Sequence, residues 1–276
     1  MQTENACLQG GKRLKGIVAG GRAGQPLVTV ISAVYNGRPY ISGCLDSVLR
    51  QDYQNIEHIV LDGGSNDGTV DVLREYDDRI ALWRSEPDKG VYDAWNKALA
   101  EARGDWICFL GVDDEFLPGA ISAYMALAAK NPQAEYLSSR MQWVHSSNYQ
   151  IIKGSRWNWR NLVMDTPHVG SMHRRILFDR LGAYDTSYRI VADYEFLLRA
   201  RSQLITAYMP VVTVMVRGGG ISSNYGFRAF EEAARAQIQN AGRNKVLVKL
   251  NLYVQKLKFK LRPLRYALAG KKTSAE

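Results

Sequence analysis

The sequence predicts an α/β fold in which a mainly parallel sheet is flanked by helices. Over residues 26–130, four short apolar runs alternate with four helical patterns, and this order implies right-handed crossovers between parallel strands. Polar loops rich in Gly, Asp and Asn follow these apolar runs, as expected at strand ends. With 276 residues and 46% hydrophobic content, the chain can bury one sizeable core.

The first half supplies the expected parallel strands. Residues 26–34 (PLVTVISAV) are apolar and β-branched after a proline, which is typical of a buried strand. The later strands are expected at Ile56–Leu61, at the start of 80–90, and at 105–112. Helical spacing of apolar residues separates them, and predicts helices over 39–52, 69–76 and 91–103.

The second half continues with mixed elements. We expect helices over 118–130, 174–185 (ended by Gly182) and 191–202, strands within 135–145 and 149–154, and a closing strand over 204–217. Trp157 and Trp159 fall in a stretch without a clear pattern. Neither an internal repeat nor a linker divides the chain.

Composition excludes several classes of protein. The three cysteines are scattered without a CxxC pair, which argues against a disulfide framework or a zinc knuckle and fits a reducing cytoplasm. The four histidines do not form a zinc-hydrolase pattern, and no GxSxG segment is present. No run is apolar enough to cross a bilayer, and residues 1–25 lack a secretory signal and are expected to form a flexible leader.

The excess positive charge is confined to the C-terminal tail. Residues 243–276 hold ten Lys or Arg and one acid, which accounts for the whole net charge of +9. Residues 1–242 are neutral, with 26 basic and 26 acidic residues. A nucleic-acid-binding body would carry the charge itself. No nucleic-acid partner is therefore expected.

The polar loops offer three candidate sites, each with a plainer interpretation. GGSNDGT (63–69) half-resembles a P-loop, but Thr69 stands where lysine is needed, and an ordinary turn capped by Asp67 is preferred. Asp113, Asp114 and Glu115 could cap the next helix, although a divalent cation with a diphosphate explains three adjacent acids better. Asp193 alone would be read as a carboxylate at a helix start.

Five segments taken together resemble a known family. In order, they are VTVISAVYNG, DGGSNDGT, SEPDKGVYDAWNKAL, GDWICFLGVDDEF and RIVADYEFLLR. They are similar to the inverting GT-A glycosyltransferases of family 2, above all to bacterial enzymes of exopolysaccharide and O-antigen assembly. The resemblance covers about residues 26 to 220. It implies a GT-A fold, with a Rossmann-like nucleotide-binding half joined to an acceptor-binding half.

The resemblance assigns the residues that bind the donor nucleotide. The end of the first strand is expected to contact the nucleoside through Val34, Tyr35 and Asn36. Asp62 matches the aspartate that reads the uracil edge. Asp88 matches the aspartate of the loop close to the nucleotide.

The resemblance also assigns metal, base and acceptor positions. Asp114 is expected to bind Mg²⁺ or Mn²⁺, and Asp113 is expected to contact the ribose or a metal-bound water. Glu115 is expected to support these two residues without contacting the cation. Asp193 matches the general base, which accepts the proton of the acceptor hydroxyl. His168 is a weaker candidate for the acceptor site, since a structural role is equally compatible with its position.

The implied function is a metal-dependent transfer of one sugar from a nucleotide-sugar, with UDP favoured, to a glycan or lipid-linked acceptor in cell-surface polysaccharide synthesis. The chain lacks the QxxRW segment of processive members, which favours one sugar per acceptor. An alternative is a non-catalytic nucleotide-binding module tethered to membrane or nucleic acid. A nucleotidyltransferase is a third possibility, but only Lys89 and Lys97 are near to hold a triphosphate.

The expected organisation is a leader (1–25), a catalytic domain (26–242) and a basic tail (243–276). In the tail, apolar residues recur at helical spacing, at Val246, Leu250, Tyr253, Leu257, Leu261, Leu264 and Leu268, with lysines beside them. Pro263 is expected to kink or end this helix. One interpretation packs it on the catalytic domain. The favoured one places it on an anionic membrane surface, at the inner face of the cytoplasmic membrane.

Overall fold

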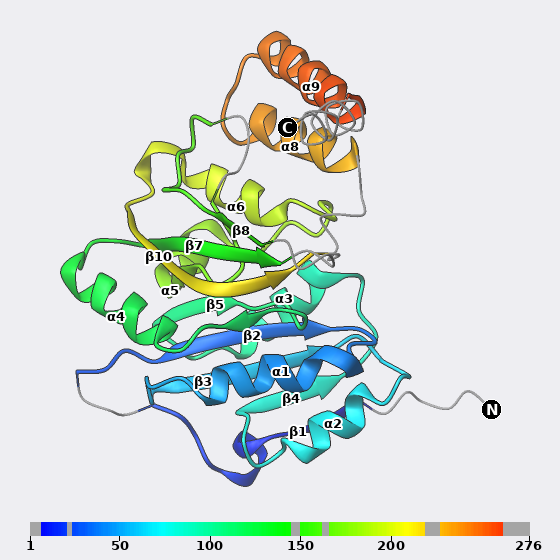
Figure 1. Ribbon diagram of the computed structural model, residues 1–276, viewed down its shortest axis with the longest axis vertical. Coiled ribbons are helices and arrows are strands. Elements are labelled where there is room, and N and C mark those ends of the chain that lie inside the picture. Colours follow the sequence, from blue (N-terminus) through cyan, green and yellow to red (C-terminus); the bar gives the residue numbers. More distant parts are fainter. Residues whose placement is uncertain (1–6, 21–23, 145–149, 162–165, 219–226, 262–276) are drawn as a thin grey trace, which may run out of the picture.

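The computed structural model describes residues 7–20, 24–144, 150–161, 166–218 and 227–261, drawn in Figure 1. The strands in this part of the chain are β1 (Leu8–Gly10), β2 (Val28–Val34), β3 (Ile56–Asp62), β4 (Leu82–Ser85), β5 (Trp106–Phe109), β6 (Glu115–Phe116), β7 (Tyr136–Val144), β8 (Gln150–Lys153), β9 (Met172–Arg174) and β10 (Thr206–Arg217). The helices are α1 (Arg38–Leu49), α2 (Thr69–Glu75), α3 (Val91–Glu101), α4 (Ala120–Lys130), α5 (Arg175–Leu181), α6 (Ala192–Ala200), α8 (Phe227–Gln239) and α9 (Lys245–Lys260), with 3₁₀ turns at Lys12–Lys15 and Arg201–Gln203.

The strands form one mixed sheet with a parallel core. Its order is β1-β4-β3-β2-β5-β9-β7-β10-β6, and β8 pairs with β7. The four strands expected to be parallel (β2 to β5) are parallel, as is the β7–β10 pair. The expected α/β architecture is confirmed. One difference is β9, where no strand was expected: it inserts antiparallel between β5 and β7, directly before α5.

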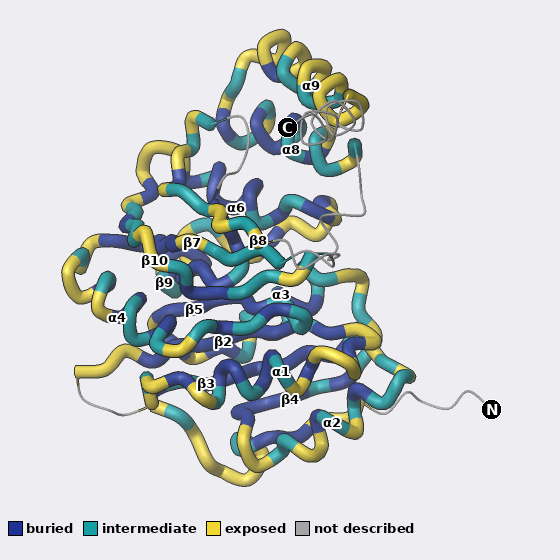
Figure 2. The backbone as a smooth tube through the Cα atoms, in the orientation of Figure 1, coloured by how far each residue is buried: buried dark blue, intermediate teal, exposed yellow. Residues whose placement is uncertain are grey.

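Helices cover both faces of the sheet, and its central strands β2, β3 and β5 are almost entirely buried (Figure 2). Because side chains alternate across a strand, Val28 and Val30 of β2 pack on the face covered by α4, while Ile31 packs on the face covered by α3, α5 and α6. A smaller cluster under α1 and α2 includes Val34. The loops that follow the carboxyl ends of the strands therefore start from a sheet that is packed against helices on both faces.

The expected flexible leader is wrong for Leu8–Lys15. β1 pairs antiparallel with β4 at one edge of the sheet, and the following 3₁₀ turn carries Arg13 to the buried carboxylate of Glu57. The side chains of Arg13 and Glu57 are 7% and 0% exposed. Gly-rich, polar residues gave no local sign of this because the stabilising partners lie far along the chain.

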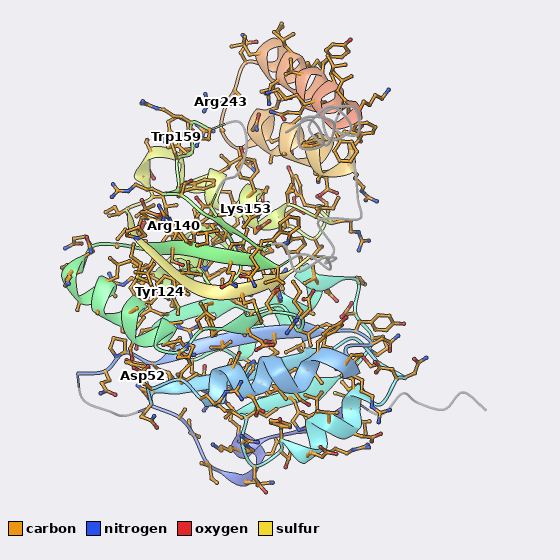
Figure 3. All side chains as sticks on the ribbon, in the orientation of Figure 1. Asp52, Tyr124, Arg140, Lys153, Trp159 and Arg243 are labelled. Atoms are coloured by element: carbon orange, nitrogen blue, oxygen red, sulfur yellow. The ribbon has the colours of Figure 1, made fainter. Side chains whose placement is uncertain are left out.

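The two tryptophans without an assigned pattern anchor the second half. Trp157 is buried and packs edge-on against Tyr194 of α6, with ring centroids 5.8 Å apart. Trp159 lies beside Arg243 (Figure 3). Arg243 is in the turn between α8 and α9, and its guanidinium carbon is 5.3 Å from the centroid of the Trp159 ring. The loop thus joins α6 to the last two helices.

The basic tail begins as a helix that packs on α8, at the end of the molecule away from β1 (Figure 1). Val248 is buried, and the ring of Phe259 contacts Phe227 and Phe230 of α8. The predicted apolar stripe faces outward over the described part of the tail: Val246, Leu250, Tyr253, Leu257 and Leu261 are 73%, 60%, 66%, 45% and 45% exposed. Pro263, Leu264 and Leu268 lie outside the described residues.

Neither α9 nor any other helix within the described residues combines the length and apolar character needed to cross a membrane.

Candidate active site

Three loops meet where neighbouring parallel strands end. The register of the sheet pairs Val34 with Asp62 and Asp62 with Ser85, so β2, β3 and β4 end side by side. The side chain of Val34 is buried in the core. Among the residues expected to contact the nucleoside, only Tyr35 and Asn36 therefore present side chains outside the core.

Asn36 joins the first loop to the second. Its Oδ1 accepts a hydrogen bond from the backbone N–H of Asn66 (3.0 Å), and its own N–H donates to Ser65 Oγ (2.7 Å). Its φ of 50° lies in the left-handed region, which Asn tolerates better than most residues. The Asp67 carboxylate accepts from the N–H of Arg38 and of Thr69 (both 3.0 Å), which bridges the two loops and caps α2.

Asp62 orders the second loop. Its Oδ2 accepts from the N–H of Gly64 (3.1 Å) and of Ser65 (2.9 Å) and from Ser85 Oγ (2.6 Å), while Ser65 Oγ donates to Oδ1. Asp62 is 1% exposed. A base edge could contact this carboxylate only if the loop opened, so its use as a uracil reader stays a prediction.

Tyr35 and Asp88 both lie close to the bare backbone of Gly63. A Cβ built on Gly63 would lie 2.6 Å from Asp88 Oδ2 and 3.4 Å from Tyr35 Cδ2, so no side chain fits there. The Tyr35 residue is 66% exposed, and Asp88 Oδ1 accepts from the N–H of Gly90 (2.7 Å). An exposed ring beside a carboxylate and a bare backbone is suited to stack on and hydrogen-bond a nucleoside.

The acidic cluster lies at the end of β5. A Cβ on Gly111 would be 2.5 Å from Asp114 Oδ2 and 3.0 Å from Asp113 Oδ1, so both carboxylates converge on one glycine. Burial, and secondly the charge of Asp113, raise the pKa of Asp114 to about 7. Asp114 Oδ1 accepts from the backbone N–H of Arg217 (3.1 Å), whose guanidinium pairs with Glu115 at 2.8 Å.

The donor set fits a hard divalent cation that shares its coordination with a substrate. Among the described residues, no group of three or more His, Cys, Asp or Glu forms a complete metal site. Asp113 and Asp114 offer oxygen ligands, which Mg²⁺ and Mn²⁺ prefer, and a diphosphate would supply more. Two converging carboxylates, one of them buried with a raised pKa, are stabilised as anions by such a cation.

Asp193 occupies the first turn of α6, beside Tyr92 of α3. Burial raises the pKa of Asp193 to about 6, although 16% of its side chain remains exposed. The hydroxyl of Tyr92 lies 3.0 Å from Asp193 Oδ1 and 2.7 Å from the carbonyl oxygen of Ile190. A partly accessible carboxylate whose pKa is near neutrality can accept a proton from a hydroxyl.

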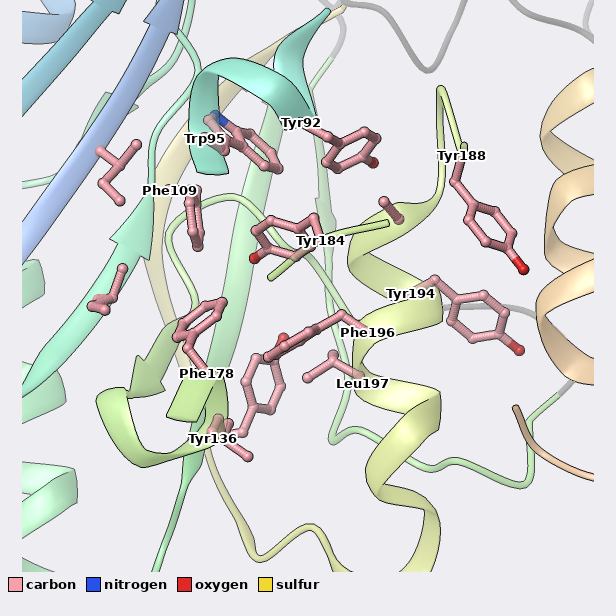
Figure 4. Close-up of a cluster of buried hydrophobic side chains, with 14 of the residues drawn as sticks. Tyr92, Trp95, Phe109, Tyr136, Phe178, Tyr184, Tyr188, Tyr194, Phe196 and Leu197 are labelled. Carbon is pink, nitrogen blue, oxygen red and sulfur yellow. The ribbon is translucent and has the colours of Figure 1, made fainter. Parts of the chain in front are cut away.

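His168 lies beside Phe109 and Asp193. Its ring stacks on Phe109, the last residue of β5, with centroids 5.3 Å apart, and its Nδ1 is 3.9 Å from Asp193 Oδ2. Neither ring nitrogen has a hydrogen-bond partner among the described residues, and burial lowers its pKa to about 3. The ring is neutral and packs against Trp95, Phe109 and Tyr184, three members of the cluster drawn in Figure 4, so its acceptor role stays a prediction.

Two residues of this site were not identified from the sequence. Tyr92 stands in a segment read only as helix, and Arg217 is the last residue of the closing strand. Their positions relative to Asp193 and Asp114 depend on contacts across 101 and 103 residues of chain. Local patterns carry no signal for such pairs.

Comparisons with known proteins show the family. The model of the family described as glycosyl transferase family 2 matches residues 29–180. A PGL/p-HBAD biosynthesis glycosyltransferase of Mycobacterium bovis (strain BCG / Pasteur 1173P2) is 31% identical over 207 residues, which span 72% of this chain and 80% of the relative.

Two solved structures share the fold. TarS 1–349 of S. aureus, in complex with UDP-GlcNAc, has a TM-score of 0.65 at 16% identity, over 86% of this chain and 73% of that one. The mannosyltransferase PcManGT of Pyrobaculum calidifontis, in complex with GDP-Man and Mn²⁺, has a TM-score of 0.62 at 18% identity, over 96% and 81%. At these identities the likeness shows the fold, which is the expected GT-A type.

Proposed function

The chain belongs to glycosyl transferase family 2 and is a glycosyltransferase, and from this premise we propose that it moves one sugar, with inversion, from a nucleotide-sugar to a hydroxyl of a cell-envelope glycan or lipid-linked acceptor. One observation carries the proposal. Two carboxylate sets support it: Asp113 and Asp114 converge after β5, and Asp193 stands at the start of α6, next to a segment whose Arg189 donates to the loop that carries Asp88. Each set has a distinct chemical task.

Asp193 is the general base of this reaction. Its carboxylate takes the proton of the acceptor hydroxyl as that oxygen bonds to the anomeric carbon, while the bond to the nucleoside diphosphate breaks and the diphosphate leaves with the electron pair. Attack opposite the leaving group inverts the anomeric centre. Tyr92 lies against Asp193 Oδ1, and the neutral ring of His168 packs with its Nδ1 3.9 Å from Oδ2.

Asp113 and Asp114 hold Mg²⁺ or Mn²⁺ in this proposal. The cation, when bound, stabilises negative charge on the departing diphosphate. Arg217 keeps Asp114 oriented through its backbone N–H and adds a positive charge at the same place. PcManGT binds its donor together with Mn²⁺, which supports a metal here.

The donor is proposed to be a UDP-sugar. The exposed ring of Tyr35 would stack on the base, and Asp88, beside the same backbone, would hydrogen-bond the nucleoside. The two structural neighbours bind UDP-GlcNAc and GDP-Man respectively, so the base must be tested directly. Calorimetry with UDP, GDP and CDP, each with and without Mn²⁺, decides it: tight UDP binding that requires metal supports the proposal, and no binding of any nucleotide contradicts it.

Asp114→Asn should abolish the metal dependence of nucleotide binding. The substitution keeps the size of the side chain but removes the charge that attracts the cation. UDP affinity in the presence of Mn²⁺ should fall by about 100-fold or more, because even the loss of a residue that only hydrogen-bonds to a metal ligand often lowers metal affinity about 10- to 100-fold. Calorimetric titration with UDP measures this directly.

Asp71→Asn is the matched control, because Asp71 is an exposed carboxylate of α2 that forms an ion pair with Arg74 one turn along the same helix. Its UDP affinity should equal that of the wild type. Unchanged metal-dependent affinity in Asp114→Asn would remove Asp114 from the metal site.

We further propose that α9 binds the inner face of the cytoplasmic membrane, with residues 26–242 as the catalytic domain and 243–276 as the tail. The exposed face of α9 is apolar, and Lys245–Lys260 contains five lysines and no acid. Apolar side chains at the acyl boundary with lysines beside anionic headgroups are the arrangement expected of an interfacial helix. A lipid-linked acceptor would lie on the same surface.

Leu250→Ser with Tyr253→Ser should release the protein from anionic vesicles. Both side chains are more than half exposed on α9, so the variant removes apolar contact without disturbing the face that packs on α8. Affinity for vesicles containing phosphatidylglycerol should fall roughly 10- to 100-fold, measured by co-sedimentation. Ile176→Ser with Val211→Ser, at similarly exposed positions elsewhere, should bind normally, and equal binding by both variants would exclude α9.

A further inference from the structure

The segment before α6 is held by a carboxylate from a distant helix. Glu232 of α8 accepts hydrogen bonds through Oε2 from the backbone N–H of Ile190 (2.9 Å), Arg189 (3.0 Å) and Val191 (3.4 Å). Glu232 is 8% exposed. These N–H groups lie at a helix start, where donors lack partners within the helix. Val191, the N-cap residue, offers no side-chain hydrogen bond, so a residue 41 positions along the chain supplies the acceptor.

The same segment contacts the groups around Asp193. The carbonyl oxygen of Ile190 accepts from the Tyr92 hydroxyl, which also lies against Asp193 Oδ1. The guanidinium of Arg189 donates to the carbonyl oxygen of Lys89, in the loop that carries Asp88. One short stretch of backbone thus connects α8, the base and the donor loop.

We propose that Glu232 is a positioning residue that fixes the carboxylate of Asp193 through the segment Arg189–Val191 and Tyr92. The proposal rests on the role of Asp193 as general base. It extends the active site to α8, which reaches the base through the backbone of Arg189–Val191. The tail helix α9 packs on this same helix.

The hydrogen bonds of Glu232 explain why a carboxylate is suited to hold this backbone segment. A buried carboxylate is costly unless it is hydrogen-bonded, and three backbone N–H groups together with the guanidinium of Arg228 (3.3 Å) stabilise Glu232. A carboxylate that accepts several N–H bonds fixes the backbone more strongly than a neutral acceptor does. Without it, the Ile190 carbonyl is free to move away from Tyr92.

The surroundings of Asp193 set the expected direction of the effect. Tyr92 on α3, the neutral His168 before β9, Tyr136 on β7 and Tyr184 before α6 face it. The single proton of the Tyr92 hydroxyl can be donated either to the Ile190 carbonyl or to Asp193 Oδ1. When the loss of Glu232 frees the Ile190 carbonyl, the proton is left to Asp193, which favours the ionised carboxylate, so the pKa of Asp193 falls from about 6.

Glu232→Gln tests the proposal, with Glu231→Gln as the control. Glu231 precedes it on α8, is half exposed and pairs with Lys256, so the control removes the same charge from the same helix. Two quantities are measured on the full chain with Mn²⁺: turnover of UDP-glucose, UDP-GlcNAc and GDP-mannose to water, and the titration of the Asp193 carboxyl by carbon-13 NMR, assigned with Asp193→Asn. Calorimetry with UDP gives donor-site affinity.

In Glu232→Gln we expect kcat to fall roughly 10- to 100-fold, the cost of misplacing a catalytic group by about 1 Å. UDP affinity should stay within about twofold, and Asp193 should titrate at lower pH than in the wild type. Combining Glu232→Gln with Tyr92→Phe should cost less than the sum of the two, because both act through Ile190. Glu232→Asp, which keeps the charge, should recover part of the lost kcat.

Unchanged Asp193 titration in Glu232→Gln would overturn the proposal, as would additive effects with Tyr92→Phe. If the Gln variant fails to fold, Glu232→Asp decides: lower kcat at wild-type UDP affinity supports positioning, and wild-type kcat overturns it. A wild-type protein that turns over no donor counts against the proposed function alone, since the carboxyl titration still reports whether Glu232 acts on Asp193.

Discussion

Asp193→Asn is expected to abolish sugar transfer while nucleotide binding is retained. The substitution preserves the shape of the side chain and the contact with Tyr92, but the amide cannot accept the proton of the acceptor hydroxyl. Loss of a positioned general base costs about 10²- to 10⁴-fold in rate. Release of nucleotide from the donor in the presence of acceptor, and calorimetry with UDP, measure the two quantities separately.

The pH dependence provides a second test of Asp193. Because burial raises its pKa to about 6, the wild-type carboxylate is ionised at pH 7 and becomes protonated below pH 6. The wild-type rate should therefore rise with pH through about 6 and level off above it. This acid limb should be absent from the residual activity of Asp193→Asn. An unchanged limb in that variant would assign the titrating group to another residue.

The parallel core was predictable because its signals are local. Runs such as Val28–Val34 are apolar and β-branched, and each is followed by a polar loop and an amphipathic helix. Parallel strands joined by right-handed crossovers must end at one rim, so the loops with Asp62 and Asp88 could be placed together before any coordinates. The structure brings the ends of β2, β3 and β4 into register, as this reasoning requires.

The contacts that tune the site were not predictable, because each joins residues far apart in sequence. Nothing in the local pattern of α8 relates Glu232 to the backbone of Ile190. The sequence of α8 also has few large apolar residues, so it gives little indication of a packed helix. Asp62 shows the converse. Its position was expected, but its carboxylate is committed to the loop N–H groups and Ser85, a role that depends on how the loop closes.

The tail shows how composition can indicate a surface without fixing its partner. Helical spacing predicted the stripe, and the structure turns that stripe outward while Val248 and Phe259 pack inward. α9 packs on α8 through one face, as the first interpretation expected, and the membrane interpretation stays a prediction that rests on the exposed apolar face. The vesicle experiment addresses only that second face.

Arg13→Ala is expected to lower the free energy of unfolding by about 3–5 kcal/mol, the cost of leaving a buried charge without its partner. Arg13 pairs with Glu57 and also donates to the carbonyl oxygen of Glu101 (2.7 Å). Glu57 further accepts from Thr29 Oγ1 (2.5 Å) and from the N–H of Arg103 (2.6 Å), so its charge stays fixed inside the protein when Arg13 is removed. Urea denaturation measures the change.

Two comparisons separate this pair from an ordinary ion pair. Arg74→Ala breaks the exposed pair with Asp71 and should change stability by less than about 1 kcal/mol. Arg13→Met combined with Glu57→Gln removes both charges and should recover much of the loss, because neutral groups of similar size avoid the uncompensated charge. A small effect of Arg13→Ala would mean that Glu57 is rehydrated in the variant, and that Leu8–Lys15 contributes little to the stability of the sheet it joins.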